Sequence, residues 1–313
     1  MSTFQPLVST ITPCYGMKRY LRRFLEELPN QTAFDSIEII LDHNDPEAEE
    51  IEWVQDFQSR YPGHLKHIVV RPVQPIGISM NRCVAQSSAE YLAIWNVDDL
   101  RTPRSIELQL RALQQDQAAD IVYGDYTVVG KFESIAGVPV RHESIPESEL
   151  TRSMILGPFF MFRRSLLQRA GHFDEQLRSG ADFDLAVRLA FNGRAIHLGE
   201  NLGYYLNEGL GASTRANSLQ PAERTVIELR YGIYDKLDYA YLPSAVEYNV
   251  ANLLKDGIYM HVRQFVPDYE NILRERREAW LLEGIGRYYK RHRSVALVIR
   301  SARNHLRDAF TSK

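Results

Sequence analysis

The first hundred residues alternate between short apolar runs and amphipathic stretches, and this alternation constrains the fold more than any other feature. Segments 7–11, 37–41, 65–70 and 91–95 are strand-like, because they are rich in apolar and β-branched residues. The segments between them, 20–28, 53–57 and 77–88, have apolar residues at helical spacing. Such alternation is typical of a parallel sheet covered by helices. The sequence therefore predicts an α/β fold with a mostly parallel, Rossmann-like sheet flanked by helices.

The pattern changes after residue 100 of the 313-residue chain. We expect short strands at 121–123 and 126–129, a loop-rich stretch at 131–149, a helix at 182–191 and a strand at 195–198. Beyond residue 219 the pattern is mostly helical. We therefore divide the chain into two halves of one domain, residues 1–100 and 101–219, and a helical C-terminal extension, residues 220–313.

Two adjacent carboxylates, Asp98 and Asp99, follow the strand-like run that ends at Trp95. Aspartate is depleted in strands and is rarely buried without a partner, so the pair needs either a capping role or a cation. In open α/β sheets, ligands bind beyond the carboxyl ends of the strands. The alternative is a turn before the next helix, but Thr102-Pro103 supplies a start signal for that helix. We favour a cation bound to a diphosphate.

Composition indicates an ordinary soluble protein, with 44% hydrophobic and 25% charged residues. The apolar runs are too short to span a bilayer, and Met1 to Pro6 do not resemble a signal peptide. The two cysteines, Cys14 and Cys83, fit a reducing compartment better than a disulfide framework. We therefore expect a cytoplasmic protein.

The C-terminal segment is basic, with eleven Lys and Arg against four Asp and Glu between Ile272 and Lys313. An apolar helical stripe runs through it from Val295 to Phe310. A basic amphipathic helix of this kind is typical of peripheral contact with an anionic membrane. The alternative is that the stripe packs on the protein itself. Both interpretations stay open, the first of them placing the tail on the inner membrane face, and we expect no nucleic-acid partner.

Several motif classes are absent from the sequence. No glycine-rich phosphate loop of the dinucleotide or P-loop type follows the first strand, which argues against a nucleotidyltransferase. No HExxH or paired-cysteine zinc pattern and no Gly-x-Ser-x-Gly elbow occurs. A zinc protease and a serine hydrolase are therefore not supported.

Six short elements give the chain a resemblance to the family-2 glycosyltransferases with the GT-A fold, roughly over residues 7–215. In chain order these are Pro13-Cys14-Tyr15, Asp42, Gly77 to Asn81, Asn96-Val97-Asp98-Asp99, Gly171-His172-Phe173-Asp174, and a helix opened by Asp182 and Asp184 that contains Arg188-Leu189. Each element alone is common. Their order and spacing together are typical of that family.

The resemblance implies a nucleotide-diphosphate-sugar donor and a divalent cation, Mg²⁺ or Mn²⁺. A cation on the phosphates neutralises the charge that grows as the glycosidic bond breaks. Hard cations prefer oxygen ligands and retain water, so one or two carboxylates suffice. Asp98 is the first choice for metal ligand and Asp99 the second. Asn96 replaces the first acid of the Asp-x-Asp motif and would bond a ribose hydroxyl or a metal-bound water.

The resemblance also implies where the donor binds. Asp42 would accept a hydrogen bond from the imide N–H of uracil or thymine, although its turn-rich surroundings also allow a turn role. Asn81 would lie near the diphosphate. Arg71 is a candidate for the base or phosphate, although we expect both Arg71 and Arg82 at the surface. The wall around the base would consist of Thr12, Pro13 and Tyr15.

Asp182 is the predicted general base, because an inverting transfer needs a carboxylate to take the proton of the acceptor hydroxyl. The alternative is an aspartate stabilised by the helix dipole. Ala181 replaces the acid that often precedes the base in the family, and Asn207 stands where many relatives have a histidine near the metal. Asp184 and Arg188 are four residues apart, which predicts a helical salt bridge.

The sequence thus predicts an inverting, metal-assisted glycosyltransferase of the hexosyltransferase type that serves polysaccharide biosynthesis. Its acceptor would be a glycan or a lipid-linked glycan. The alternative is a catalytically decayed GT-A protein that binds sugar nucleotides or acts as a scaffold, which Asn96, Ala181 and Asn207 favour. Retention of Asp98 and Asp182 favours the enzyme.

Overall fold

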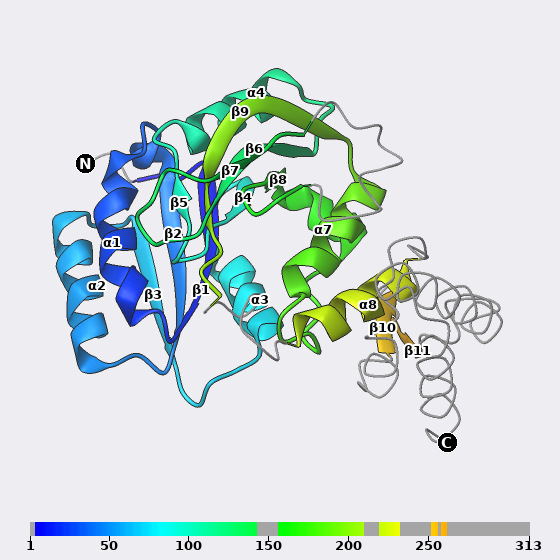
Figure 1. Cartoon of the computed structure of the whole chain (residues 1–313), viewed down its shortest axis with the longest axis horizontal. Helices are drawn as coiled ribbons and strands as arrows, with labels where there is room; N and C mark the ends of the chain where they lie inside the picture. Colours follow the sequence, from blue (N-terminus) through cyan, green and yellow to red (C-terminus); the bar gives the residue numbers. More distant parts are fainter. Residues whose placement is uncertain (1–3, 143–155, 210–218, 232–251, 256–257, 262–313) are drawn as a thin grey trace, which may run out of the picture.

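The computed structural model describes residues 4–142, 156–209, 219–231, 252–255 and 258–261. In these ranges one nine-stranded sheet has the order β3-β2-β1-β4-β8-β6-β9-β5, with β7 paired to β6. Helices cover both of its faces (Figure 1). The predicted α/β sheet flanked by helices is confirmed.

The first half follows the predicted alternation closely. Its elements are β1 (Val8–Tyr15), α1 (Lys18–Glu27), η1 (Leu28–Asn30), η2 (Phe34–Ser36), β2 (Ile37–Asn44), α2 (Ala48–Arg60), β3 (Leu65–Val70), α3 (Ile76–Gln86) and β4 (Tyr91–Ile94). Strands β3, β2, β1 and β4 are all parallel. Their carboxyl ends therefore lie at one edge of the sheet.

Two apolar cores lie on opposite faces of this sheet. Strand β4 contributes Leu92 and Ile94 to the core under α3 and α7, and Tyr91 and Ala93 to the core under α1, α2 and α4. The alternation follows from the two-residue period of a strand. A strand buried on both faces has a nearly continuous run of apolar residues, which is why β4 contains no charged residue.

The second half contains β5 (Leu100–Arg101), α4 (Ser105–Gln115), β6 (Ile121–Val129), β7 (Val138–Val140), β8 (Met161–Arg163), η3 (Arg164–Leu166), α6 (Leu167–Ala170), α7 (Ala181–Asn192) and β9 (Ala195–Leu206). The prediction of two strands at 121–123 and 126–129 was wrong. They form one strand, because an irregular register at Gly124 and Asp125 lets β6 continue along β9. Strand β8 is antiparallel to β4 and β6, so the sheet is mixed.

The acid pair lies in the turn between β4 and β5. The helix after it, α4, has Arg104 as N-cap and no side-chain cap, so neither aspartate caps it. The predicted start at Thr102-Pro103 was also wrong. The Thr102 N–H donates to Leu202 O at 3.1 Å and its hydroxyl to Asn201 O at 3.0 Å, which attaches Thr102 to β9.

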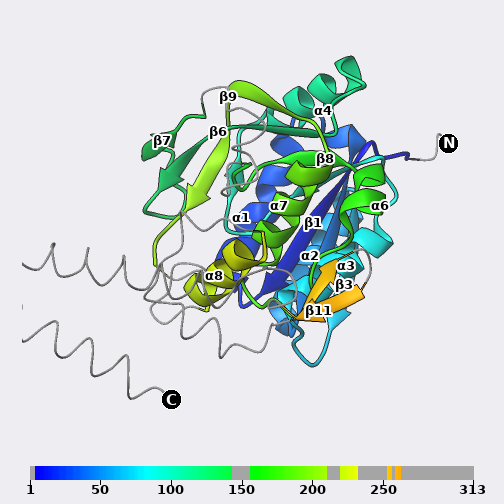
Figure 2. The same ribbon diagram turned by 90° about the vertical axis from the view of Figure 1, so that its right-hand side faces the viewer.

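The C-terminal extension is described only in part. Helix α8 (Gln220–Arg230) lies beside α7 in both views (Figures 1 and 2). The antiparallel pair β10 (Asn252–Lys255) and β11 (Ile258–His261) was not predicted. The basic stripe from Val295 to Phe310 lies outside the described residues, and the domain boundary at 219 stays a prediction. Among the described helices, none has the length and apolar character that a membrane crossing needs.

Candidate active site

A cavity of about 300 Å³ opens between the turn after β4 and the start of α7. Asp98 and Asp182, which come from different halves of the chain, both line it. The other polar residues in its wall are Asn96, Asp99, Ser179 and Gln220, and the rest of the wall is Pro13, Met17, Ile76, Met80, Val97, Tyr126, Gly157, Pro158, Tyr205 and Leu206. The sheet thus brings the predicted metal ligand and the predicted base to one cavity.

The two acids of the pair have different environments. Asp99 is buried, and its carboxylate accepts hydrogen bonds from the Leu206 N–H at 3.0 Å and the Asn96 amide at 3.3 Å. Asp99 therefore ties the turn to the end of β9. Asp98 is only partly buried. Burial raises its pKa, and the charge of Glu208 raises it further.

Asp98 has the chemistry to hold a divalent cation together with the donor. Among the described residues, no group of three or more His, Cys, Asp or Glu side chains could hold a metal. A cation at Asp98 would therefore need phosphate oxygens and water as its further ligands, which is how Mg²⁺ is commonly bound. The donor set fits such a shared site rather than a metal cage formed by the protein alone.

The predicted nucleobase site contains an ion pair between Asp42 and Arg82. Asp42 is fully buried, and it accepts hydrogen bonds from Arg82 Nε and from Asn44 Nδ2 at 2.8 Å. The Asn44 amide also donates to Ser79 Oγ at 2.9 Å. The prediction that Arg82 lies at the surface was wrong, because its side chain is only 27% exposed and forms an ion pair with Asp42.

The remaining donor-site candidates are dispersed. Pro13 lines the cavity, Thr12 is buried and Tyr15 is 59% exposed. Arg71 is exposed, as predicted, and donates to Asp45 Oδ1 at 3.2 Å and to Pro46 O. Of the ten predicted site residues, five line the cavity, namely Pro13, Asn96, Asp98, Asp99 and Asp182. The other five lie outside its wall: Thr12, Tyr15, Asp42, Arg71 and Asn81.

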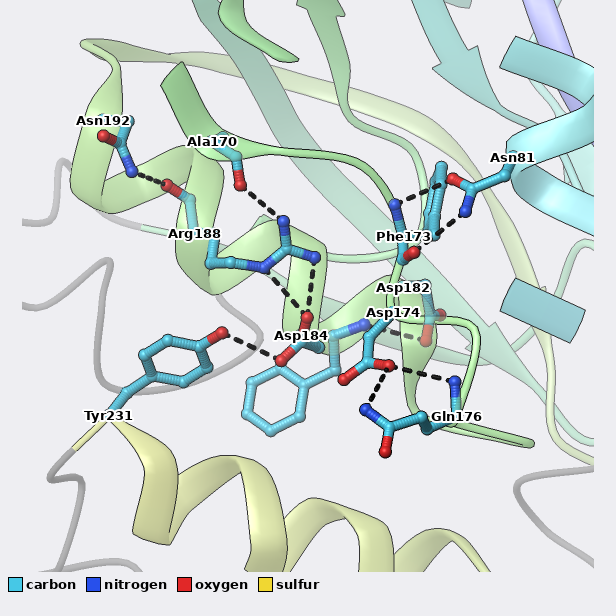
Figure 3. A network of polar contacts seen from close by, with 11 residues as sticks. Asn81, Ala170, Phe173, Asp174, Gln176, Asp182, Asp184, Arg188, Asn192 and Tyr231 are labelled. Carbon is cyan, nitrogen blue, oxygen red and sulfur yellow. Dashed lines mark hydrogen bonds and ion pairs between the residues drawn. The ribbon is translucent and has the colours of Figure 1, made fainter. Parts of the chain in front are cut away.

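Asn81 joins the two halves of the domain. Its amide donates to Phe173 O at 3.0 Å, and its oxygen accepts from the Phe173 N–H at 2.9 Å (Figure 3). The amide also donates to Glu175 Oε1 at 2.9 Å. One turn earlier on α3, a Cβ at Gly77 would lie 2.4 Å from Asp174 O. The segment from Gly77 to Asn81 therefore packs directly against the segment from Gly171 to Asp174.

Asp182 lies in the first turn of α7, where its Oδ1 accepts a hydrogen bond from the Phe183 N–H at 2.8 Å. Burial raises the pKa of Asp182 to about 6, and the nearby charge of Glu223 adds to this rise. A carboxylate with this pKa is ionised at neutral pH and is a stronger base than an exposed aspartate. Its geometry and pKa suit proton abstraction at the cavity wall.

The predicted salt bridge on α7 is confirmed. Arg188 Nη2 lies 2.7 Å from Asp184 Oδ2, and Arg188 also donates to Ala170 O (Figure 3). The Tyr231 hydroxyl donates to Asp184 Oδ1 at 2.9 Å. Asp184 thus bonds to Arg188 on the same helix and to Tyr231 after α8. These two contacts fix the helix that carries Asp182.

Two acids near the site were missed by the sequence reasoning. Glu208 accepts hydrogen bonds from Arg19 at 3.1 Å and from the Tyr20 hydroxyl, which ties the chain beyond β9 to α1 near Asp98. Asn207, next to it, is exposed. Glu223 on α8 accepts three backbone N–H bonds just before α7. Neither glutamate belongs to a local motif, so only the folded chain reveals them.

Comparison with known families and curated proteins gives consistent matches. The family model described as glycosyl transferase family 2 matches residues 9–171, which is more than half of the chain. Hyaluronan synthase of Pasteurella multocida is 23% identical over 241 residues, covering 74% of this chain and 24% of that protein. An uncharacterized glycosyltransferase of Methanocaldococcus jannaschii is 23% identical over 197 residues, covering 60% of this chain and 66% of that protein. The chain thus spans about a quarter of hyaluronan synthase and two thirds of the archaeal relative.

Solved structures support the same fold. Residues 1–349 of Staphylococcus aureus TarS with UDP-GlcNAc match with a TM-score of 0.60 and 16% identity, over 75% of this chain and 68% of those 349 residues. The mannosyltransferase PcManGT of Pyrobaculum calidifontis, with GDP-Man and Mn²⁺, matches with a TM-score of 0.52 and 15% identity, over 98% and 88%. At this identity the matches establish the fold alone, and the predicted GT-A fold is confirmed.

Proposed function

Since the chain belongs to glycosyl transferase family 2, we propose that it transfers a sugar from a nucleotide-diphosphate donor to an acceptor hydroxyl, with inversion at the anomeric carbon. One observation carries the proposal: Asp98 and Asp182 line a single cavity although they come from different halves of the chain. An inverting displacement needs a base on the face of the sugar opposite the leaving diphosphate. The presence of both acids in the wall of one cavity supports this proposal.

In the proposed reaction, the acceptor oxygen attacks the anomeric carbon while Asp182 takes the hydroxyl proton. The bond between that carbon and the diphosphate oxygen breaks, and its electron pair leaves with the diphosphate. A bound Mg²⁺ or Mn²⁺ would supply charge neutralisation there. Asp98 would hold that ion, and Asn96 would bond the ribose or a water. Asp99 supports the turn through Leu206.

For the nucleobase, we propose Asp42 and Arg82 as the recognition pair at the end of β2. Their ion pair is buried on the Asp42 side and partly exposed on the Arg82 side. Because relatives of this fold are seen with UDP-GlcNAc and with GDP-Man, both UDP and GDP are suitable probes. Thr12, Pro13, Tyr15, Arg71 and Asn81 stay predictions as donor-binding residues.

We further propose a glycan or lipid-linked acceptor, a role in polysaccharide biosynthesis, and a cytoplasmic site of action with peripheral membrane contact through the basic tail. The names hyaluronan synthase and chondroitin synthase support the polysaccharide part. The basic segment from Ile272 to Lys313 supports the membrane part. Vesicle co-sedimentation of the chain with and without residues 283–313 tests the tail, and equal binding by both would exclude it.

The second candidate is a sugar-nucleotide-binding protein without catalysis. Asn96 and Ala181 favour it, because each replaces an acid of the family pattern. Such a protein would bind nucleotide but would not need a carboxylate with a raised pKa at the cavity. Asp182 has one, and this favours the enzyme.

A thermal-shift panel with UDP and GDP, each with and without Mn²⁺, tests the proposal. A ligand that binds the folded state raises the melting temperature. We expect one nucleotide to stabilise the protein in a Mn²⁺-dependent manner, and Asp98→Ala to lose this. The control Asp56→Ala removes a carboxylate from the exposed face of α2, where it pairs with Arg60, and should leave the shift intact.

Turnover separates the two candidates. With the matching sugar nucleotide, Asp182→Asn should retain nucleotide binding and lose transfer and donor hydrolysis. Unchanged turnover in Asp182→Asn would remove Asp182 from the mechanism. Binding without any turnover in the native protein, across donors and acceptors, would favour the non-catalytic candidate.

A further inference from the structure

A buried glutamate from α8 closes the loop that leads into α7. Glu223 has no exposed surface, and its carboxylate accepts hydrogen bonds from three successive backbone N–H groups. The donors are Arg178 and Ser179, each at 2.7 Å, and Gly180 at 2.6 Å. Glu223 lies outside the region that the family model matches, residues 9–171.

The Arg178 and Ser179 N–H groups belong to the loop before α7, and the Gly180 N–H belongs to the N-cap residue of that helix. Gly180 has no side chain, so no N-cap side chain holds the start of α7. Successive N–H groups in a turn form a concave site that favours an anion. Here Glu223, from a helix more than forty residues further along, supplies that anion.

The contact between α8 and the start of α7 is close. A Cβ at Gly180 would lie 3.0 Å from Ile227 Cδ1 and 3.5 Å from Glu223 Cβ, so α8 leaves little room for a side chain at this position. On the other side of Asp182, the Tyr231 hydroxyl at the end of α8 donates to Asp184 (Figure 3). Helix α8 therefore holds the chain immediately before and immediately after the proposed base.

We propose that Glu223 is the positioning residue for the base: its carboxylate orders residues 178–180 and thereby directs Asp182 into the cavity. This inference rests on the proposed function, because it assigns Glu223 a role in proton abstraction by Asp182. Glu223 is not placed against the substrate and takes no part in bond making. It acts through the backbone that it holds.

Charge gives Glu223 a second effect on the base. Charged groups near Asp182 in the described residues include Glu223 on α8, Asp98 and Asp99 in the wall of the same cavity, and the Asp184–Arg188 ion pair on α7 itself. Glu223 is the one whose charge raises the pKa of Asp182. Loss of the Glu223 charge should therefore lower that pKa and weaken Asp182 as a base.

The test compares Glu223→Gln with the control Glu228→Gln. Glu228 lies on the same helix, is almost equally buried and pairs with Arg224 of that helix at 2.8 Å, so the control removes a similar buried charge from α8 without touching the bonds to residues 178–180. We expect Glu223→Gln to lower kcat about 10- to 100-fold with donor KM within about 3-fold, as a misplaced catalytic group does. In Glu223→Gln, the acidic limb of the pH–rate profile should move to lower pH. In Glu228→Gln, both kcat and the position of the acidic limb should stay as in the native protein.

Hydrogen exchange provides a readout that needs no turnover. The N–H groups of residues 178–180 should exchange faster in Glu223→Gln than in the native chain and in the control. If Glu223→Gln does not fold, Glu223→Asp takes its place, because it keeps the charge and shortens the reach to the three N–H groups. It should show the kcat loss with a smaller shift of the acidic limb.

Three results would overturn the inference: kcat of Glu223→Gln within 2-fold of native, unchanged exchange at residues 178–180, or an equal kcat loss in Glu228→Gln. A native chain without turnover, but with the expected change in exchange, would instead refute the proposed function. The two failures are therefore distinguishable.

Discussion

Replacing Asp182 with asparagine should make the protein more stable while it removes transfer. Burial raises the pKa of this carboxyl from 3.8 to about 6, so the folded state disfavours the ionised form that the cavity requires at neutral pH. Asparagine keeps an oxygen that accepts the Phe183 N–H bond but carries no charge. The variant therefore lacks the cost of a desolvated carboxylate.

The sign and size follow from proton linkage. The folded state holds this proton more tightly than the unfolded chain does, so native stability falls as pH rises from about 4 to about 6 and the full cost is present above that. At about 1.4 kcal/mol per pKa unit the upper limit is about 3 kcal/mol. Solvent at the partly exposed carboxyl, and about 0.5 kcal/mol of favourable interaction with the α7 dipole, reduce this to about 1–2 kcal/mol.

Thermal unfolding at two pH values is the assay. We expect Asp182→Asn to melt about 2–8 °C above the native protein at pH 8, given about 2–4 °C per kcal/mol for a domain of this size. At pH 5 the difference should be about half as large, because part of the native carboxyl is then protonated. Asp56→Asn, on the exposed face of α2, controls for loss of a charge. Equal melting of Asp182→Asn and native protein at pH 8, or a gap independent of pH, would refute the reasoning.

Three further results are expected. The rate of transfer should fall below a pH of about 6 as Asp182 is protonated, and a profile flat from pH 5 to 8 would exclude it as the base. Gly77→Ala should cost about 1–3 kcal/mol in thermal unfolding, because its Cβ would meet Asp174 O at 2.4 Å, whereas Gly199→Ala, with open space at that position, should cost less than about 1 kcal/mol. Arg82→Gln should cost about 3–5 kcal/mol in denaturant unfolding because it leaves Asp42 charged and buried, while Arg60→Gln at an exposed pair should change little; similar small effects for both would show that Arg82 does not compensate Asp42.

The sequence predicted those parts of the fold that local patterns control. A buried parallel strand has a run of apolar residues, and a helix that covers the sheet has apolar residues at helical spacing. The positions of β1 to β4 and α1 to α3 were therefore predicted to within a few residues. The length of β6 was missed because a bulge at Gly124 and Asp125 breaks the local pattern while pairing to β9 continues. The length of β6 depends on its pairing with β9, and such pairing leaves no local pattern in the sequence.

The same limit applies to the site. Asp98 and Asp182 were predicted through the resemblance, which carries information on spatial order that periodicity lacks. The pairing of Arg82 with Asp42 and the bonds from residues 178–180 to Glu223 join positions some forty residues apart. An arginine on an amphipathic helix or a glutamate in a helical first turn is ordinary as sequence. Each acquires its role only when the sheet or α8 brings its partner within hydrogen-bond distance.

The spacing between the two proposed catalytic acids is controlled by contacts outside the cavity. Asp98 is attached to the sheet through Asp99 and Leu206, whereas Asp182 follows a loop that the sheet does not contain. That loop is held at its start by Asn81 on α3 and at its end by Glu223 on α8. Glu223 lies outside the cavity wall and is not among the predicted donor-binding residues, so substitutions there should alter the alignment of base and acceptor while the donor side remains intact. Donor affinity and the rate of transfer should therefore separate in this protein, with affinity following Asp98 and rate following Glu223 at the end of the loop.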